Sequence, residues 1–144
     1  MKTKIIDRKN YTIFIDKMKN RVYFQPTNQI WRLKDMDFLL LDWKEIIAQM
    51  QRNFTILSDI RNLQIQSPRL DKLHEEIQKY VTENGLLKVA RVLADNDIVN
   101  LQFGRIAERS LMPNNVFYTI EDAERYLDRI AKEFEELQEN NRKK

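Results

Sequence analysis

The clearest hydrophobic pattern lies near the middle of the chain, where Phe54–Leu57 is an apolar run interrupted only by Thr55. A nearly continuous apolar run of this length is typical of a strand covered on both faces. Polar residues follow it, and Ser67-Pro68 then predicts a helix start, because serine caps the first turn and proline has no N–H to lose. The apolar positions of that helix recur at helical spacing up to Gly85, and they are Leu70, Leu73, Ile77, Tyr80 and Val81.

The next run, Leu86–Leu93, is rich in aliphatic and β-branched residues and predicts a second strand. A strand–helix–strand unit of this length pairs its two strands in parallel. The centre of the fold is therefore predicted to be parallel α/β.

Before this unit, Tyr11–Asp16 and Arg21–Gln25 predict an antiparallel hairpin around a short polar turn. The second of these strands alternates apolar with polar residues, so we expect the face that carries Arg21 to be the less buried one. The loop after Pro26 carries Trp31, which is either tucked into the core or exposed for a partner. An amphipathic helix follows, with the inward positions Leu39, Trp43, Ile46, Ile47 and Met50.

A polar turn at Asp95–Asp97 predicts a cap for the next helix, over residues 98–111. The expected inward positions of this helix are Ile98, Leu101 and Ile106, with Val99 and Phe103 to one side. Gly104 lies inside it at a cost of about 1 kcal/mol relative to alanine, which we interpret as close packing against a neighbour. A short last strand is expected at Val116–Tyr118.

Thr119 then caps a long C-terminal helix with the sharpest apolar stripe in the chain, formed by Ile120, Ala123, Leu127, Ile130, Phe134 and Leu137. A helix over residues 120–140 is roughly 30 Å long, whereas a five-residue strand spans about 17 Å. Its last turns should therefore overhang the sheet. The overhang either frays or packs Phe134 and Leu137 against another subunit, and the charged tail from Glu139 is expected to be disordered.

Together these elements predict one α/β domain over residues 1–144, with a mixed sheet of about five strands, an N-terminal antiparallel hairpin and about four helices. Its core is expected over about residues 10–131, with the helix overhang and charged tail over about 132–144. The net charge is +3, but basic and acidic residues are interleaved without a basic helix, which argues against nucleic-acid binding. No apolar run has the length of a signal peptide core or a transmembrane segment, so the expected location is the cytoplasm.

Several kinds of chemistry are excluded by composition. The chain has no cysteine, which removes disulfides and thiolate catalysis, and two glycines are too few for a dinucleotide fingerprint or a P-loop. We predict no cofactor, no metal site and no catalytic residue. His74, the only histidine, is expected to pack in the core or lie on the surface. Arg91 lies mid-strand, where a charge is costly unless paired, so a structural ion pair is expected rather than a binding role.

Three segments taken in order resemble the STAS fold, and more narrowly the SpoIIAA-like domains related to anti-sigma-factor antagonists: Phe54–Leu70, Gly85–Leu93 and Asn115–Ala123. The resemblance covers the predicted core and implies a non-enzymatic regulatory or binding module. In the antagonists, a strand ending in aspartate leads to a helix start with a phosphorylatable serine. Asp59 and Ser67 are the matching positions here, which makes Ser67 a candidate phosphoacceptor beside its simpler role as a helix cap.

Open α/β sheets bind ligands beyond the carboxyl ends of their parallel strands. The candidate partner- or ligand-binding residues are the polar residues expected there, which we call the rim: Asp59, Arg61, Asn62, Asp95 and Asn96. Asp59 paired with Arg61 is the expected polar anchor. The alternative for each rim residue is a helix cap or a solvated turn.

Three functions are open on this basis. The first is a non-enzymatic cytoplasmic regulatory or protein-interaction module, whose partner is another protein or a second copy of the chain. The second is a carrier of a small apolar ligand or lipid, which needs a pocket on the order of several hundred Å³ between the sheet and the helices bearing Trp43 or Phe103. The third is an enzyme that uses rim carboxylates, which needs two converging titratable groups in one pocket.

Overall fold

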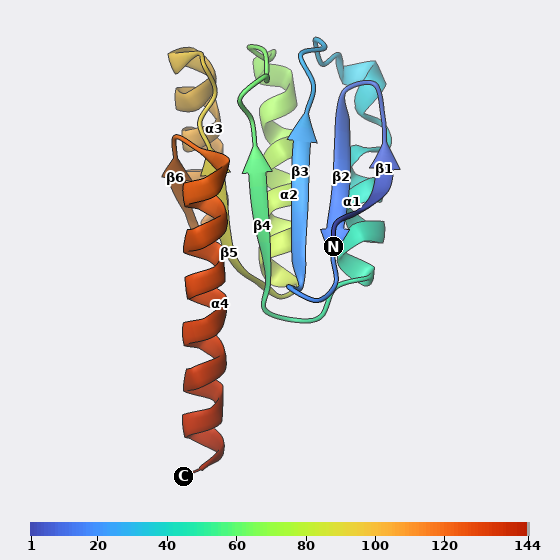
Figure 1. The fold of residues 1–144 in the computed structure, drawn as a ribbon. Helices are drawn as coiled ribbons and strands as arrows, with labels where there is room; N and C mark the ends of the chain where they lie inside the picture. Colours follow the sequence, from blue (N-terminus) through green and yellow to red (C-terminus); the bar gives the residue numbers. More distant parts are fainter. Residues whose placement is uncertain (144) are drawn as a thin grey trace.

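The computed structural model describes residues 1–143, apart from the side chain of residue 35; Lys144, the last residue of the predicted tail, lies outside the described residues. Six strands form one sheet in the order β1-β2-β3-β4-β5-β6 (Figure 1). They are β1 (Thr3–Asp7), β2 (Tyr11–Asp16), β3 (Arg21–Pro26), β4 (Phe54–Asp59), β5 (Leu86–Val92) and β6 (Asn114–Phe117). The first three pair antiparallel and β3 to β6 pair in parallel, which confirms the predicted α/β class, the N-terminal hairpin and the parallel centre.

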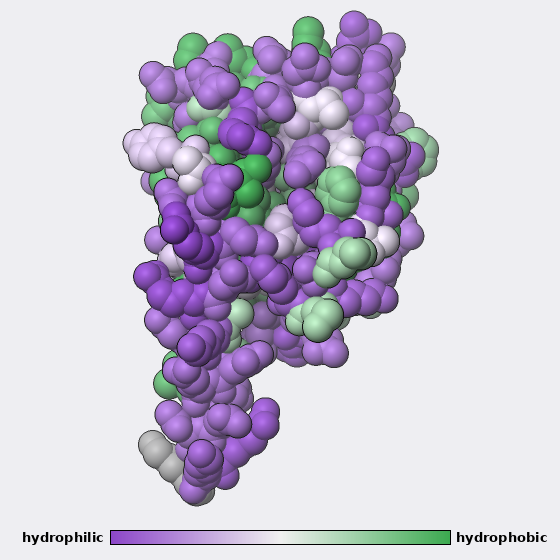
Figure 2. All heavy atoms as spheres, in the orientation of Figure 1, coloured by the Kyte–Doolittle hydropathy of each residue, from purple (hydrophilic) through white to green (hydrophobic). Residues whose placement is uncertain are grey.

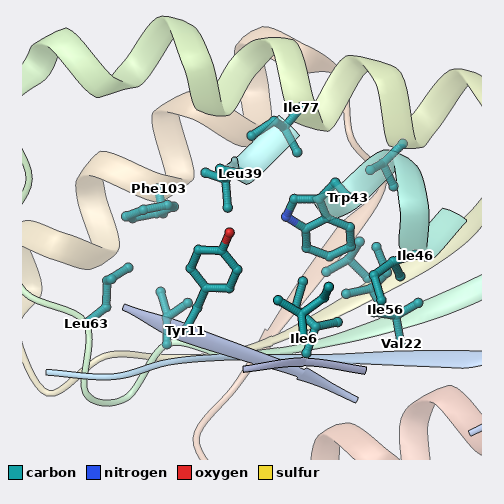
Figure 3. Packing of buried hydrophobic residues seen from close by; sticks show 14 of the residues in the cluster. Ile6, Tyr11, Val22, Leu39, Trp43, Ile46, Ile56, Leu63, Ile77 and Phe103 are labelled. Atoms are coloured by element: carbon teal, nitrogen blue, oxygen red, sulfur yellow. The ribbon is translucent and has the colours of Figure 1, made fainter. Parts of the chain in front are cut away.

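The helices lie on both faces of this sheet. They are α1 (Leu39–Ala48), α2 (Asp71–Glu83), α3 (Asp97–Ser110) and α4 (Ile120–Arg142), with short 3-10 turns η1 (Leu33–Met36) and η2 (Pro68–Leu70). Helices α1, α2 and α3 cover one face, and α4 crosses the other, where it contacts β4, β5 and β6 (Figure 1). The larger core lies under the first three helices, and Figure 3 shows Trp43, Ile77 and Phe103 reaching from them towards the sheet.

Strand β4 occupies the centre of the sheet between β3 and β5, as its apolar run predicts. Its side chains alternate between the two cores: Ile56 packs under α1–α3, and Leu57 packs with Ala123 and Leu127 of α4. Because both faces are covered, both sets of positions must be apolar, which is why the run is continuous.

Three predictions of detail are wrong. Strand β1 extends the fold to residue 3, where the sequence shows a basic terminus; it is a short edge strand, and only Ile6 of its five residues is buried. On α3, Ile98 and Leu101 are 58% and 59% exposed, whereas Val99, Phe103 and Ile106 face the core. The predicted disordered tail is helical through Arg142.

Gly104, inside α3, does not mark the predicted close packing. The nearest atom that an added Cβ would meet is Nη2 of Arg91 at 3.9 Å, an ordinary van der Waals distance. We therefore expect Gly104→Ala to raise the free energy of unfolding by about 1 kcal/mol, the difference in helix propensity between the two residues. Urea denaturation of both proteins measures this, and a loss of stability in the variant would show that the helix is closer to its neighbours than described.

Candidate functional site

The rim forms as predicted at the carboxyl ends of β4 and β5. The Arg61 side chain donates from Nε to Asp59 Oδ1 at 2.9 Å and from Nη2 to Asp59 Oδ2 at 3.0 Å, a two-pronged ion pair. These hydrogen bonds to Asp59 raise the pKa of Arg61. The backbone N–H of Asp95 donates to the Arg61 carbonyl, so the ends of the two strands meet. The predicted Asp59–Arg61 anchor is confirmed as a contact.

The members of the rim differ in what they can still bind. Asp59 is buried and holds the half-exposed Arg61 beside a polar hollow of about 490 Å³, which Asn62 also lines. Asn96 is occupied as a helix cap, because its Oδ1 accepts from the N–H groups of Ile98 and Val99. The rim therefore offers one fixed guanidinium in a solvated hollow and little apolar surface.

Two further candidates have structural positions. Trp31 is 3% exposed and packs against the rings of Tyr11, Phe24 and His74, so of its two predicted placements the core is the correct one, and a partner cannot reach it. Ser67 is exposed, and its Oγ accepts from the N–H of Arg69 as the cap of η2. Its phosphorylation stays a prediction.

The ion pair predicted for Arg91 is wrong. Its side chain leaves β5 on the face covered by α1–α3 and is only 7% exposed. No hydrogen bond or ion pair joins its guanidinium to any residue that the structure describes, and its Nε is fully buried without a partner. The predicted ion pair is thus not found within residues 1–143, and burial lowers the pKa of Arg91.

A cavity of about 70 Å³ lies beside Arg91, between the sheet and helices α1–α3. Trp43 and Phe103 both line it, as the carrier hypothesis predicted, and so does Ile56 of the sheet. Figure 3 shows both aromatic rings on the helix side of the sheet. The volume is several times smaller than that hypothesis requires. Four lining residues besides Arg91 bring polar groups: Ser58, His74, Gln78 and Asn114.

His74 is buried at the side of this cavity, which confirms a packing role. Its ring lies between Trp31 and Phe103, with centroid distances of 5.5 Å and 5.0 Å, and its Nε2 is 2.6 Å from Gln66 Oε1. Burial lowers the pKa of His74 to about 4, so the ring is neutral at pH 7.

A third place that could bind a partner is the end of α4, which projects below the sheet (Figure 1). Between this end and the loops at the bottom of the sheet lies an open hollow of about 740 Å³, which we call the α4 corner. Its apolar lining is Leu87, Met18, Ala131 and Phe134. Leu137 follows Phe134 by one turn and is 61% exposed, but it lies outside the lining of the corner.

Comparison with family models, with curated proteins and with solved structures gave no match. In the described part of the chain, no helix combines the length and the apolar character needed to cross a membrane. Function is therefore inferred from the geometry of the rim, the cavity and the α4 corner.

Proposed function

We propose that the protein is a non-enzymatic module that acts through protein contacts, and that it pairs with a second copy through the α4 corner. One observation carries the proposal: α4 stays helical through Arg142, although every residue from Glu135 to Arg142 is exposed. The last turns of a helix gain little stability when they pack against nothing, because most helical stability in a protein comes from packing of the apolar face. A partner seated in the corner would supply that packing for Ala131 and Phe134, which line it.

The charges around the corner favour a second copy over an unrelated protein. The loop side of the corner carries the basic residues Lys17, Lys19 and Arg52. The helix side has a net negative charge, since its acidic residues Glu135, Glu136 and Glu139 outnumber Lys132 and Arg142. In a two-fold pair the same patch meets itself, so the acidic side of each copy can face the basic side of the other. Figure 2 shows that the projecting end is largely hydrophilic, which fits a contact with a small apolar centre and a charged border.

Sedimentation velocity over a range of protein concentrations tests the pairing. We expect the unmodified chain to form a dimer, and Phe134→Ser, a change in the apolar lining of the corner, to weaken it by about 10- to 100-fold, the effect of losing one buried apolar side chain. Arg129→Ser, an exposed change on α4 outside the corner, should leave the dimer intact. A chain that stays monomeric at all concentrations would refute the pairing.

The charge argument has its own test in the same experiment. Arg52→Glu should weaken the dimer, because it places like charges on both sides of the contact, and adding Glu135→Arg to the same chain should restore it. If the double variant forms no more dimer than Arg52→Glu alone, the two charges do not face each other across the contact, and the proposed two-fold arrangement is wrong.

We also propose that the protein belongs to the SpoIIAA-like branch of the STAS fold and that it acts in the cytoplasm. The order of strands and helices from β2 to α4 supports this kinship, together with the aspartate at the end of β4. Under the same proposal the rim is a second contact surface, because Asp59 fixes Arg61 where a partner carboxylate could bind it. A lipid carrier is less favoured, because the cavity beside Arg91 is too small for a lipid.

A further inference from the structure

We propose that the cavity beside Arg91 is a binding site for a short monocarboxylate with an apolar tail. The inference is independent of pairing through α4, which involves the opposite face of the sheet. It stands on three observations: a buried guanidinium without a partner, a cavity next to it, and the chemistry of the cavity wall.

The guanidinium of Arg91 lacks a countercharge. Among the described residues no aspartate or glutamate lines the cavity, and Arg91 takes part in none of the ion pairs. A charge held away from water is unfavourable unless an opposite charge or several hydrogen bonds compensate it. Arg21 shows how this chain compensates a buried arginine, with Asp128 and Glu124 both within 3.0 Å. At Arg91 the same role is open to a bound anion.

The form of the site selects the class of anion. A guanidinium matches a carboxylate in shape and can donate two parallel hydrogen bonds to it. Ser58 lies next to Arg91 across the β4–β5 pair and adds one hydroxyl to the same wall. Gln78 and Asn114 add side-chain amides to the wall, but Arg91 is the one cation among the described lining residues. One cation suits a single negative charge, whereas a phosphate dianion would need a second.

The apolar lining residues determine which apolar tail the ligand can have. Phe24, Ile56, Val89 and Phe103 line the cavity with hydrocarbon. A water molecule needs about 10–15 Å³ of such volume, so a cavity of about 70 Å³ has room for a compact group of a few heavy atoms. A branched aliphatic acid of five to seven heavy atoms is therefore the expected size class, on the order of isovalerate.

Thermal unfolding with added sodium isovalerate tests the site. We expect the midpoint to rise with isovalerate beyond the effect of sodium chloride at equal concentration, by about 3–5 °C at ten times the dissociation constant. Isovaleramide has the same tail without the charge and should have little effect. In Arg91→Met the rise should disappear, whereas Arg105→Met, an exposed arginine of α3, should respond like the unmodified chain.

The variant is expected to fold, because methionine replaces a buried unpaired charge with an apolar chain of similar length. NMR gives a second reading on the unmodified protein: the Nε–Hε signal of Arg91 should move as isovalerate is added and stay in place with isovaleramide. An equal rise with chloride, meaning an adventitious ion only, would overturn the site. An unchanged response in Arg91→Met, or an Arg91 signal that isovalerate does not move, would also overturn it.

Discussion

Replacing Arg21 by methionine should destabilise the fold by about 2–4 kcal/mol and loosen α4 from the sheet. Arg21 is 1% exposed at the start of β3, and its Nη1 lies 2.9 Å from Asp128 Oδ1 and 3.0 Å from Glu124 Oε2. Its Nε donates to Thr55 Oγ1. Removal of one partner from a buried ion pair leaves the other charge uncompensated, which costs about 3–5 kcal/mol when both are fully buried. The expected loss is smaller here because both carboxylates are partly solvated.

The effect should be concentrated on α4 because little else fixes this helix. Only Ala123 and Leu127 are fully buried on it. Around them, Tyr23 donates its hydroxyl to Glu124, and Lys19 pairs with both Glu124 and Asp128. Burial of Glu124 opposes its charge, but the hydrogen bonds from Tyr23 and Lys19 and the charge of Arg21 outweigh it and lower the pKa of Glu124.

Denaturant unfolding measures the loss, and hydrogen exchange along α4 locates it. Arg125→Met is the matched control, since this exposed arginine pairs only with Asp122 of its own helix and should change stability by less than about 0.5 kcal/mol. Adding Glu124→Gln to Arg21→Met should recover part of the loss, because the partly buried carboxylate that lost its contact with Arg21 is then replaced by a neutral amide. A stable Arg21→Met protein with normal protection of α4 would show that apolar packing alone holds the helix.

Arg21 and Arg91 also show where the sequence stops being informative. Arg21 was expected on the less buried face of its strand, but it is buried and forms ion pairs with Glu124 and Asp128. Arg91 was expected to form an ion pair, but it has none within residues 1–143. The carboxylates that compensate Arg21 come from a helix about a hundred residues later, and α4 packs on the face that Arg21 enters. Local patterns show that a charge sits in a strand, but only tertiary packing determines which charge meets a partner.

Features set by nearby residues could be predicted. The buried strand β4 follows from its continuous apolar run, and Asp59 meets Arg61 because two residues separate them at a strand end. The face of α3 was wrong because the stripe was counted from Ile98, whereas Asn96 caps the helix and the buried positions begin at Val99. The position of the cavity near Trp43 and Phe103 was predicted. Its small volume and the unpaired charge of Arg91 could not be predicted, because both depend on how α1, α2 and α3 pack on the sheet.

Acid should destabilise this protein through a single histidine. Burial lowers the pKa of His74 from 6.5 to about 4, so between these values the unfolded chain binds a proton that the folded chain does not. Stability therefore falls as the pH falls through this window. The expected loss is about 2 kcal/mol from pH 7.5 to pH 5 and about 3 kcal/mol once the pH is below about 4.

The comparison of the chain with His74→Gln isolates this effect, because no other histidine is present. Urea unfolding of both proteins at pH 7.5, 6 and 5 should show a falling free energy for the unmodified chain and a much flatter profile for the variant. The carboxylates that titrate in acid, Glu124 among them, are shared by the two proteins and cancel in the difference. Parallel profiles, or an NMR titration of His74 with a midpoint near 6.5, would mean that the ring is solvated in the folded state and that the core around Trp31 and Phe103 is open to water.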